Sequence, residues 1–445
     1  MQQALPLPHP DLERDNEFAS ARRQVFTPTR EAALDRLGQF VPRAGSHYAR
    51  RRNFDLGPEQ REGVSLLSPY VRHRLVLETE VLEAVLAEHS ASAAEKFVQE
   101  VCWRTYWKGW LEMRPSVWRA YRGELQWRIE QLGSDASLRQ RYESAIAGET
   151  GLDPFDSWTR ELISTGYLHN HARMWFASLW VYTLDLPWVL GADFFYRHLL
   201  DGDPASNTLS WRWVCGLHTH GKTYLARPDN IARFTAGRFQ PDRSQLAAEA
   251  HALEGPPHPS PTPVPEAELD WNDGARRRCA LLVTEEDMHP ESWPVHGEIA
   301  GAAGLTSTRH RSPLRVGALA REYASQAMHD ALQRFAARRD GVAAPSSGDD
   351  RSLPFDPAKD LLDHPEPDQL VAWCRDRDVD HLVTAWAPVG PVAEVLDELR
   401  PALLHAGIEL SRLRRPWDDA AWPHATRGFF AFKRRIPGLL ESHVG

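Results

Sequence analysis

The chain has 445 residues, of which 42% are hydrophobic and 25% charged, a composition typical of a folded protein large enough for two or three domains. It contains no run of eighteen apolar residues and no basic and apolar leader, so we expect a cytoplasmic, monomeric protein without a membrane span. The net charge is −9, yet residues 1–240 carry 29 basic and 29 acidic side chains, which places the whole excess of acid in the remainder. A neutral first part can hold a local basic groove, so the net charge does not exclude a nucleic-acid partner.

The cysteines predict neither a disulfide framework nor a metal site. They lie far apart in the sequence and form no CxxC pair, at Cys102, Cys215, Cys279 and Cys374. We therefore expect reduced, buried thiols and no bound metal.

Residues 1–30 are polar and interrupted by prolines, which predicts an N-terminal arm, and a short amphipathic helix follows from Glu31. A triple arginine at 50–52 lies between Tyr48 and Phe54. Such a cluster is either an ordinary solvated face or, beside aromatic rings, a contact for nucleic acid or a diphosphate.

The next predicted helix covers Ala91 to Met113, with Ser92 as its N-cap and Glu95 completing a capping box. On it a carboxylate and two indoles share one face, because Glu100, Trp103 and Trp107 are spaced at i, i+3 and i+7. The spacing suits a core as well as a binding site. The arginines that follow are either a track for a DNA backbone or ordinary surface charge: Arg114, Arg119, Arg122 and Arg128.

The segment from Asp153 to Trp213 contains far more aromatic and polar side chains than a purely structural pair of helices needs. We expect a helix capped by Asp153, with Pro154 at its first position, in which Asn170, Arg173 and Met174 share one face as a binding wall. A second helix, Ala192 to Leu200, ends at the turn Asp201-Gly202-Asp203-Pro204. The paired carboxylates of this turn can cap a helix, face solvent or bind a ligand.

A proline-rich stretch at 254–268 predicts a linker. Beyond it, buried strands at 279–283, 381–386 and 408–413 alternate with helices at Leu314–Arg339 and Pro391–His405, and 341–357 is loop-like. This alternation predicts a parallel sheet flanked by helices, without the glycine-rich motifs of common nucleotide sites. The expected domains are an arm (1–30), a helical domain (31–245), a linker (246–275) and an α/β domain (276–445).

Three ordered motifs resemble the flavin-binding domain of the DNA photolyase and cryptochrome family, whose signature runs TGxxHNxxRM, DGDxxxN and WxW. They are Thr165-Gly166 with His169-Asn170 and Arg173-Met174, then Asp201-Gly202-Asp203 with Asn207, then Trp211 with Trp213. The resemblance implies an all-helical FAD-binding domain followed by a Rossmann-like, antenna-like domain, the reverse of the order in most relatives.

For FAD, the resemblance implies one set of residues that contacts the diphosphate and another that contacts the flavin ring. The diphosphate contacts are Tyr48, Ser65, Leu67 and Ser68, and the ring contacts are Asn170, Arg173, Asp201, Asp203 and Asn207. Val64 stands where the family usually has Thr, and Leu66 where many photolyases have Arg, so one hydroxyl and one charge are missing. A second, antenna chromophore of unknown identity is also implied.

For the substrate, the resemblance implies DNA containing pyrimidine dimers, with an extruded lesion between Trp103 and Trp213. Glu100 and Asn170 would take part in catalysis, with Glu100 protonated, and Arg104 and Met174 would contact the lesion. Trp211 and Trp188 match the first two members of a photoreduction chain, and Ala145 falls at the third, with Tyr142 or Trp127 as candidate substitutes.

Three functions agree with these motifs. The first is light-dependent splitting of cyclobutane pyrimidine dimers with FAD, which the set Glu100, Trp103, Asn170, Met174 and Trp213 favours. The second is a cryptochrome-like photoreceptor without repair, which the exchanged domain order and the missing third tryptophan favour. The third is a flavoprotein that uses FAD only as a scaffold or as a redox cofactor in the dark.

Overall fold

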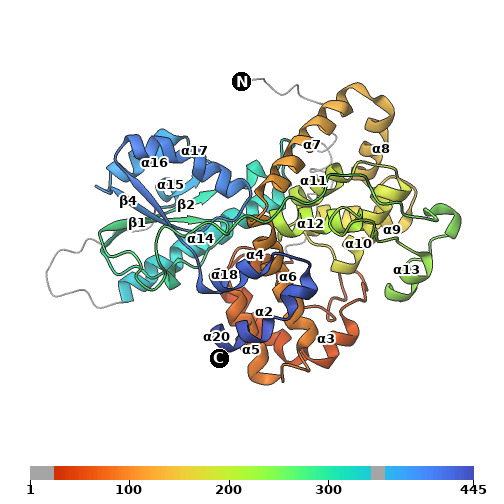
Figure 1. Ribbon diagram of the computed structural model, residues 1–445, viewed down its shortest axis with the longest axis horizontal. Helices are drawn as coiled ribbons and strands as arrows, with labels where there is room; N and C mark the ends of the chain where they lie inside the picture. Colours follow the sequence, from red (N-terminus) through yellow and green to blue (C-terminus); the bar gives the residue numbers. More distant parts are fainter. Residues whose placement is uncertain (1–24, 342–355, 445) are drawn as a thin grey trace.

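The structure, a computed structural model, describes residues 25–341 and 356–444, so most of the expected arm and most of the expected loop at 341–357 lie outside the described residues. The described chain is helical up to residue 234 and then builds a sheet (Figure 1). The helices of the first part are α2 (Arg30–Phe40), α3 (Ser46–Arg51), α4 (Ser68–Arg72), α5 (Glu78–Glu88), α6 (Glu95–Glu112), α7 (Pro115–Ser134), α8 (Ala136–Ala147), α9 (Asp153–Thr165), α10 (Asn170–Ser178), α11 (Trp188–His198), α12 (Pro204–Val214) and α13 (Pro228–Phe234).

Two predicted helix boundaries are wrong. Helix α6 begins at Glu95 because Ser90 Oγ accepts the backbone N–H of Ala93 in a turn, so Ser92 caps nothing. The helix expected from Asp153 through Ala177 is two helices, with Leu152 as the N-cap of the first.

The break between α9 and α10 lies at Gly166, which has a left-handed φ of 64°. Glycine is required there because a Cβ would lie 2.6 Å from Cγ of Leu200. The close approach brings the end of α9 against the residue that precedes Asp201, and it thereby sets the position of the Asp201–Asp203 turn.

The sheet is entirely parallel, with the strand order β3-β2-β1-β4-β5, which confirms the predicted architecture. The three expected strands are present as β1, β4 and β5, and the sequence analysis missed β2 and β3. Strand β2 is rich in glycine and alanine, which strands usually avoid, and Gly304 in it makes room for α14, because a Cβ there would lie 2.5 Å from Cγ of Met328. The strands are β1 (Cys279–Thr284), β2 (Ile299–Thr306), β3 (Leu361–Asp363), β4 (His381–Ala385) and β5 (Glu409–Leu413), and α14 covers Ala318–Gly341.

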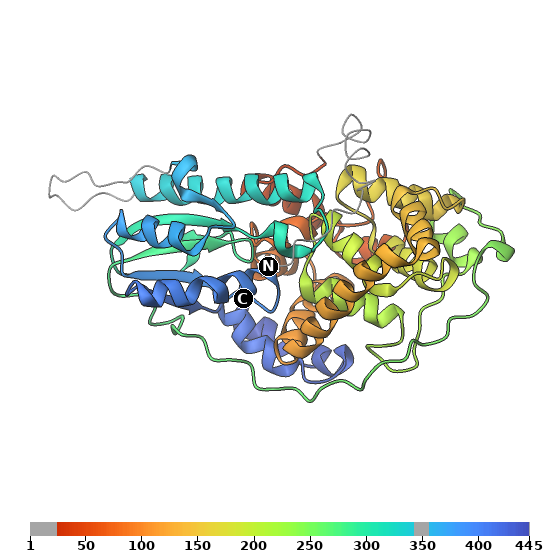
Figure 2. The same ribbon diagram turned by 90° about the horizontal axis from the view of Figure 1, so that it is seen from above.

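Helices cover both faces of the sheet (Figure 2). Alternate strand residues point to opposite faces, so Leu282 and Leu382 pack with α16 (Pro367–Arg375) and α17 (Pro391–His405). Leu281 and Val283 pack with α14 and belong to the same hydrophobic core as the helical part. The two parts therefore share one continuous core.

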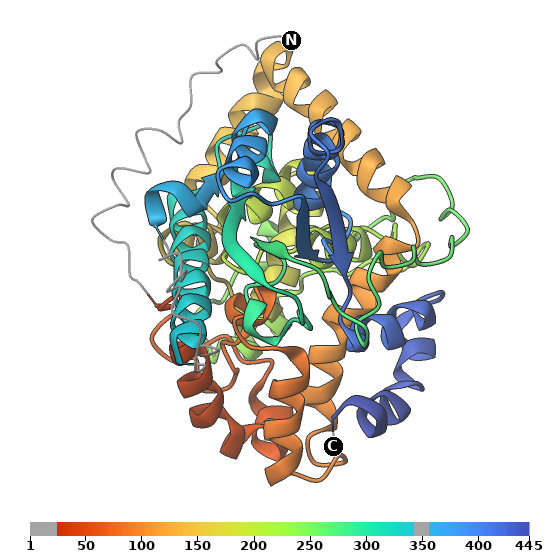
Figure 3. The ribbon, with the colours of Figure 1, turned by 90° about the vertical axis from the view of Figure 1, so that its left-hand side faces the viewer.

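Two connections complete the fold. The segment between α13 and β1 runs along the outside of the molecule, as expected for a linker, and is held by the bond from Thr262 N to Met113 O (2.9 Å) (Figure 2). After β5 the chain leaves the sheet and forms α18 (Pro416–Ala421), α19 (Phe429–Lys433) and α20 (Ile436–His443) (Figures 1 and 3). Helices α18 and α19 contact α6, and α20 packs on α18. The predicted α/β domain of 276–445 thus includes a last segment that packs on the helical part.

Candidate functional site

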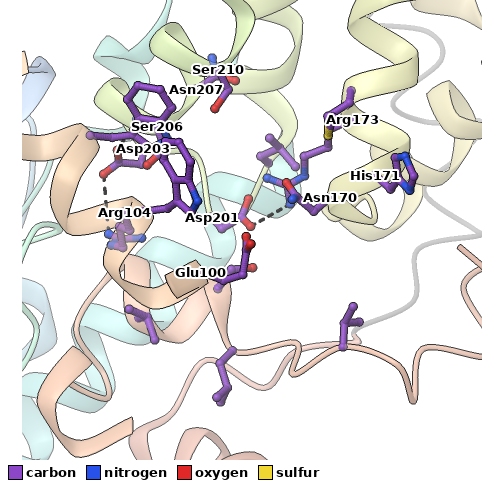
Figure 4. A pocket seen from close by; sticks show the side chains of 18 of the residues that line it. Glu100, Arg104, Asn170, His171, Arg173, Asp201, Asp203, Ser206, Asn207 and Ser210 are labelled. Atoms are coloured by element: carbon purple, nitrogen blue, oxygen red, sulfur yellow. Dashed lines mark hydrogen bonds and ion pairs between the residues drawn. The ribbon is translucent and has the colours of Figure 1, made fainter. Parts of the chain in front are cut away.

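A cavity of about 610 Å³ lies in the helical part, bounded by α6, α10, α12 and the loop at 64–68 (Figure 4). This size suits a bound cofactor or other small molecule. The cavity collects every predicted site residue except Trp188: Tyr48, Ser65, Leu67, Ser68, Glu100, Trp103, Arg104, Asn170, Arg173, Met174, Asp201, Asp203, Asn207, Trp211 and Trp213.

The turn Asp201-Gly202-Asp203 forms one wall, and in each carboxylate one oxygen accepts a hydrogen bond from the protein. Asp203 Oδ1 accepts the backbone N–H of Ser206 (2.7 Å) and so caps α12, while Asp201 Oδ2 accepts from Arg173 Nη2 (2.8 Å). Oδ1 of Asp201 and Oδ2 of Asp203 are buried without a hydrogen-bond partner among the described residues. Unsatisfied buried carboxylate oxygens are costly, so this wall fits a ligand that carries N–H or O–H donors.

Two cations surround Asp203. Arg104 Nη2 lies 3.6 Å from its Oδ2 (Figure 4). Lys108 Nζ lies 3.5 Å from the same oxygen. Burial by itself raises the pKa of Asp203, but Lys108 and Arg104 outweigh it and hold the pKa well below the usual range. Arg104 also donates to the carbonyl oxygen of Arg72 (2.9 Å) and faces Glu78. Arg104 is thus held by partners within the protein, and the lesion contact that the resemblance implies stays a prediction.

The opposite wall comes from the loop that precedes α4. Leu67 N donates to Ser65 Oγ (3.3 Å), and Leu66 has a left-handed φ of 56°. A non-glycine residue in that region stores backbone strain, which is common at binding sites. Tyr48 is buried behind this loop, and burial raises its pKa.

Arg52, the last residue of the triple arginine, lines the cavity and forms an ion pair with Glu100. Its neighbours Arg50 and Arg51 are exposed, as a solvated face predicts, and a diphosphate or nucleic-acid contact of the cluster stays a prediction. The protonated Glu100 that the resemblance implies stays a prediction.

The two expected indoles, Trp103 and Trp213, are partly exposed and line the same cavity. The protein's own side chains do not fill that cavity. The ring of Phe429, from α19, stacks on Trp103 with centroids 3.6 Å apart and planes 11° apart. One face of Trp103 is therefore covered by the protein itself, which the sequence did not predict.

Ring contacts lead away from the cavity through a residue that the sequence analysis did not name, and the photoreduction chain implied by the resemblance stays a prediction. Trp211 contacts Trp180 (6.3 Å, perpendicular), and Trp180 contacts Tyr142 (6.1 Å). Gly191 permits this packing, because a Cβ there would lie 2.4 Å from Trp211 and 2.9 Å from Trp180. Trp180 was missed because it is one of 17 tryptophans and lies in no motif.

The other residues proposed for this path lie elsewhere. Trp188 is outside the cavity and contacts Tyr121 (5.7 Å). Ala145 is fully buried, and Trp127 is 49% exposed.

Several lining residues were also missed. Ser210 and Val214 follow Asn207 at i+3 and i+7 on α12, so helical spacing could have found them. His171 follows Asn170 and is held by bonds to Asn53 O (2.9 Å) and the Tyr224 hydroxyl (3.3 Å). The missed residues also include Phe97, Val101, Tyr167 and Ser206.

Other sequence expectations concern metals, thiols and membranes. All four cysteines are buried and free, as predicted. Within residues 25–341 and 356–444, no group of three metal-binding side chains is present, and none of the helices combines the length and apolarity that a bilayer crossing needs. The cytoplasmic location and the monomeric state stay predictions.

Comparisons with known proteins identify the helical part. Residues 97–242 match the family described as the FAD binding domain of DNA photolyase. The chain is 32% identical over 201 residues to a deoxyribodipyrimidine photo-lyase of Alkalihalophilus pseudofirmus (44% of this chain, 39% of the relative). It is 32% identical over 295 residues to that of Thermus thermophilus (62% and 63%), and 28% identical over 224 residues to that of Escherichia coli (49% and 46%).

A solved class III photolyase from Agrobacterium tumefaciens aligns with a TM-score of 0.41 at 26% identity, covering 52% of this chain and 46% of that one. The chain spans less than half the length of most of the curated relatives it matches. The first part of this protein is thus an FAD-binding domain, with the acidic turn and Arg173 among the residues that line its pocket. These matches show that residues 97–242 are similar to the FAD-binding domain of DNA photolyases.

Proposed function

We propose that this protein splits cyclobutane pyrimidine dimers in DNA in a light-dependent reaction with FAD. One observation carries the proposal: a single cavity is lined by the acidic turn and Asn207 on one side and by two partly exposed indoles, Trp103 and Trp213, on another. A cofactor and an extruded base can meet there. The photo-lyase relatives support the same reaction.

Bound FAD supplies the light absorption and the electron that open the dimer. Asp201 Oδ1 and Asp203 Oδ2, which have no hydrogen-bond partner among the described residues, can accept from its N–H or O–H donors, and Arg173 orients Asp201. Tyr48, Arg52, Ser65, Leu67 and Ser68 surround the end of the cavity proposed for the diphosphate. These residues bind and orient, and they exclude water.

Asn207 has a fixed orientation in this wall. Its Nδ2 donates to the carbonyl oxygen of Ala192 (2.7 Å), which leaves its amide oxygen as an acceptor. A neutral acceptor at this position suits an N–H group of reduced flavin and brings no additional charge to the site.

On the substrate side, extruding a damaged base costs a few kcal/mol, and stacking on an aromatic side chain returns about 1–3 kcal/mol per base. Phe429 already covers one face of Trp103, so Trp213 contributes the larger share of new stacking. Glu100 and Asn170 offer polar contacts to the base carbonyls, with Arg52 holding Glu100 in place. Met174 adds apolar surface.

The test uses an oligonucleotide with one defined thymine dimer, illuminated with the FAD-loaded, reduced protein. We expect dimer loss with the unaltered chain and a strong decrease with Trp213→Ala and with Glu100→Ala. The exposed Trp127→Ala serves as the matched control, because Trp127 lies outside the cavity. Absence of dimer loss with the unaltered protein under reducing conditions would refute the proposal.

A second candidate is a cryptochrome-like photoreceptor that does not repair DNA. The stack of Phe429 on Trp103 favours it, because a protein ring occupies a face that a flipped base would use. Under this candidate Phe429→Ala would leave the protein without repair activity. Under the repair proposal the same variant keeps repairing dimers.

A further inference from the structure

The C-terminal segment after β5 returns to the helical part and follows α6 in the opposite direction. The Tyr106 hydroxyl donates to the carbonyl oxygen of Arg427 (2.9 Å), Phe429 stacks on Trp103, and Lys433 forms an ion pair with Glu95 (2.8 Å). The segment is thus fixed at both ends and at its centre.

This docking places α19 at the rim of the cavity, because Trp103 lines the cavity and also carries Phe429 on one face. The next residue, Phe430, points outward and is 82% exposed, more than any other large hydrophobic side chain in the described chain. A phenylalanine this exposed contributes little to the core, and its ring beside the cavity is free to stack on a base.

Charge defines the kind of partner. Residues 424–440 contain four basic side chains and no acidic one, although residues 241–445 as a whole carry 32 acidic and 23 basic groups. Arg427, Arg434 and Arg435 are exposed, and no carboxylate of the described residues pairs with them. Basic side chains around an exposed aromatic ring complement the phosphates and bases of a nucleic acid.

We propose that the segment Arg427–Arg435 is a DNA-binding surface at the rim of the cavity, outside the FAD-binding domain. Phe430 stacks on a base next to the lesion, and Arg427, Arg434 and Arg435 contact phosphates. The inference rests on the proposed function, since it names how the same cavity receives its DNA. The stack of Phe429 on Trp103 then holds this DNA-binding surface beside the opening of the cavity.

The experiment measures the affinity of the FAD-loaded full chain, in the dark, for a labelled duplex with one thymine dimer and for the intact duplex. The variants are Phe430→Ala and the double variant Arg434→Gln/Arg435→Gln. The matched controls are Leu404→Ala, which removes another exposed apolar side chain (75%), and Arg309→Gln/Arg375→Gln, which removes two exposed charges from the α/β part. All these positions are on the surface, so the variants should fold, which circular dichroism checks.

We expect Phe430→Ala to weaken binding of the damaged duplex at least five-fold, the lower end of the effect of one stacking contact. The double arginine variant should weaken binding of both duplexes and lower the slope of log K against log salt by about 1.8, since each phosphate contact contributes about 0.9. Both control variants should bind like the unaltered chain.

Two outcomes overturn the inference. If both variants bind DNA like the controls while the unaltered chain repairs dimers, the surface is not a DNA contact and the proposed function stands. If Phe430→Ala instead dissociates a dimer of this chain without changing DNA affinity, the surface binds a second copy. Splitting of an isolated thymine-dimer dinucleotide, which has no neighbouring base to stack on Phe430, tests the proposed function separately, and its absence in the unaltered chain refutes that function alone.

Discussion

The substitution Glu286→Gln should weaken both the folded state and the flavin cavity, because Glu286 joins the two parts of the molecule. Its carboxylate accepts from Arg72 (2.6 Å) and from Lys108 (2.9 Å), and all three side chains are at most 3% exposed. Arg72 also donates to the carbonyl oxygen of Gly202 (2.7 Å), and Lys108 lies 3.5 Å from Asp203. Glutamine keeps the shape but leaves two buried cations with one anion fewer.

Two estimates agree on the free energy of unfolding that Glu286→Gln should lose. Removing one partner of a buried ion pair costs about 3–5 kcal/mol. Burial by itself raises the pKa of Glu286, but Arg72 and Lys108 outweigh it and lower the pKa from 4.5 to about 2, a difference equivalent to about 3 kcal/mol. Because the pKa is lowered in the folded state, this stability is present above about pH 4.5 and is lost as the pH falls through about 2.

The assay is urea unfolding at pH 7 and at pH 3, together with a titration of the refolded chain with FAD. The variant should lose about 3 kcal/mol at pH 7, less at pH 3, and should bind FAD more weakly because the Asp201–Asp203 turn loses its support. The control Glu298→Gln removes an exposed carboxylate that pairs with Arg278, and it should stay within about 0.5 kcal/mol. A Glu286→Gln chain with unchanged stability and unchanged FAD affinity would refute the reasoning.

Three further predictions concern the cavity. Gly191→Ala should cost about 1–3 kcal/mol of unfolding free energy because its Cβ meets Trp211 and Trp180, whereas Gly123→Ala, with open space on α7, should not destabilise the chain in the same urea assay. Trp180→Phe should slow flavin photoreduction by blue light and reductant more than Trp188→Phe does, and the reverse order would restore the path predicted from the sequence. Asp201→Asn should weaken FAD binding about ten-fold or more, as expected for a lost charge-assisted hydrogen bond to Arg173, while the exposed Asp229→Asn should leave the dissociation constant unchanged.

Local rules predicted much of this molecule. Helix α17 has the predicted bounds because Pro391 suits its first turn and its apolar residues recur at helical spacing. The cavity wall of Asn170, Arg173 and Met174 also follows from spacing on one helix. Such features depend on residues within a few positions of each other, so the spacing of residues in the sequence is enough to predict them.

Features that depend on distant residues were missed. The stack of Phe429 on Trp103 joins residues that are 326 positions apart in the sequence. The residues around Phe429 form no pattern from which its stacking partner could be predicted. Strand β2 was missed because its glycines disfavour a strand locally, while the close packing of α14 on Gly304 makes them necessary. In both cases tertiary packing, which is invisible to local propensity, decides the outcome.

The contacts at the carboxyl edge of the sheet explain how the second part of the chain acts on the first. In open parallel sheets, ligands usually bind at this edge where the strand order reverses, here between β1 and β4. Glu286 follows β1 and pairs with Arg72 and Lys108, while Trp386 and Val389 follow β4 and both donate to Glu112 of α6 (3.0 Å each).

Side chains of the helical part thus occupy the usual ligand crevice of this sheet. A second chromophore, which stays a prediction, would need another surface of the α/β part. The edge that holds a nucleotide in other folds instead supports, through Arg72, the turn that carries Asp201 and Asp203.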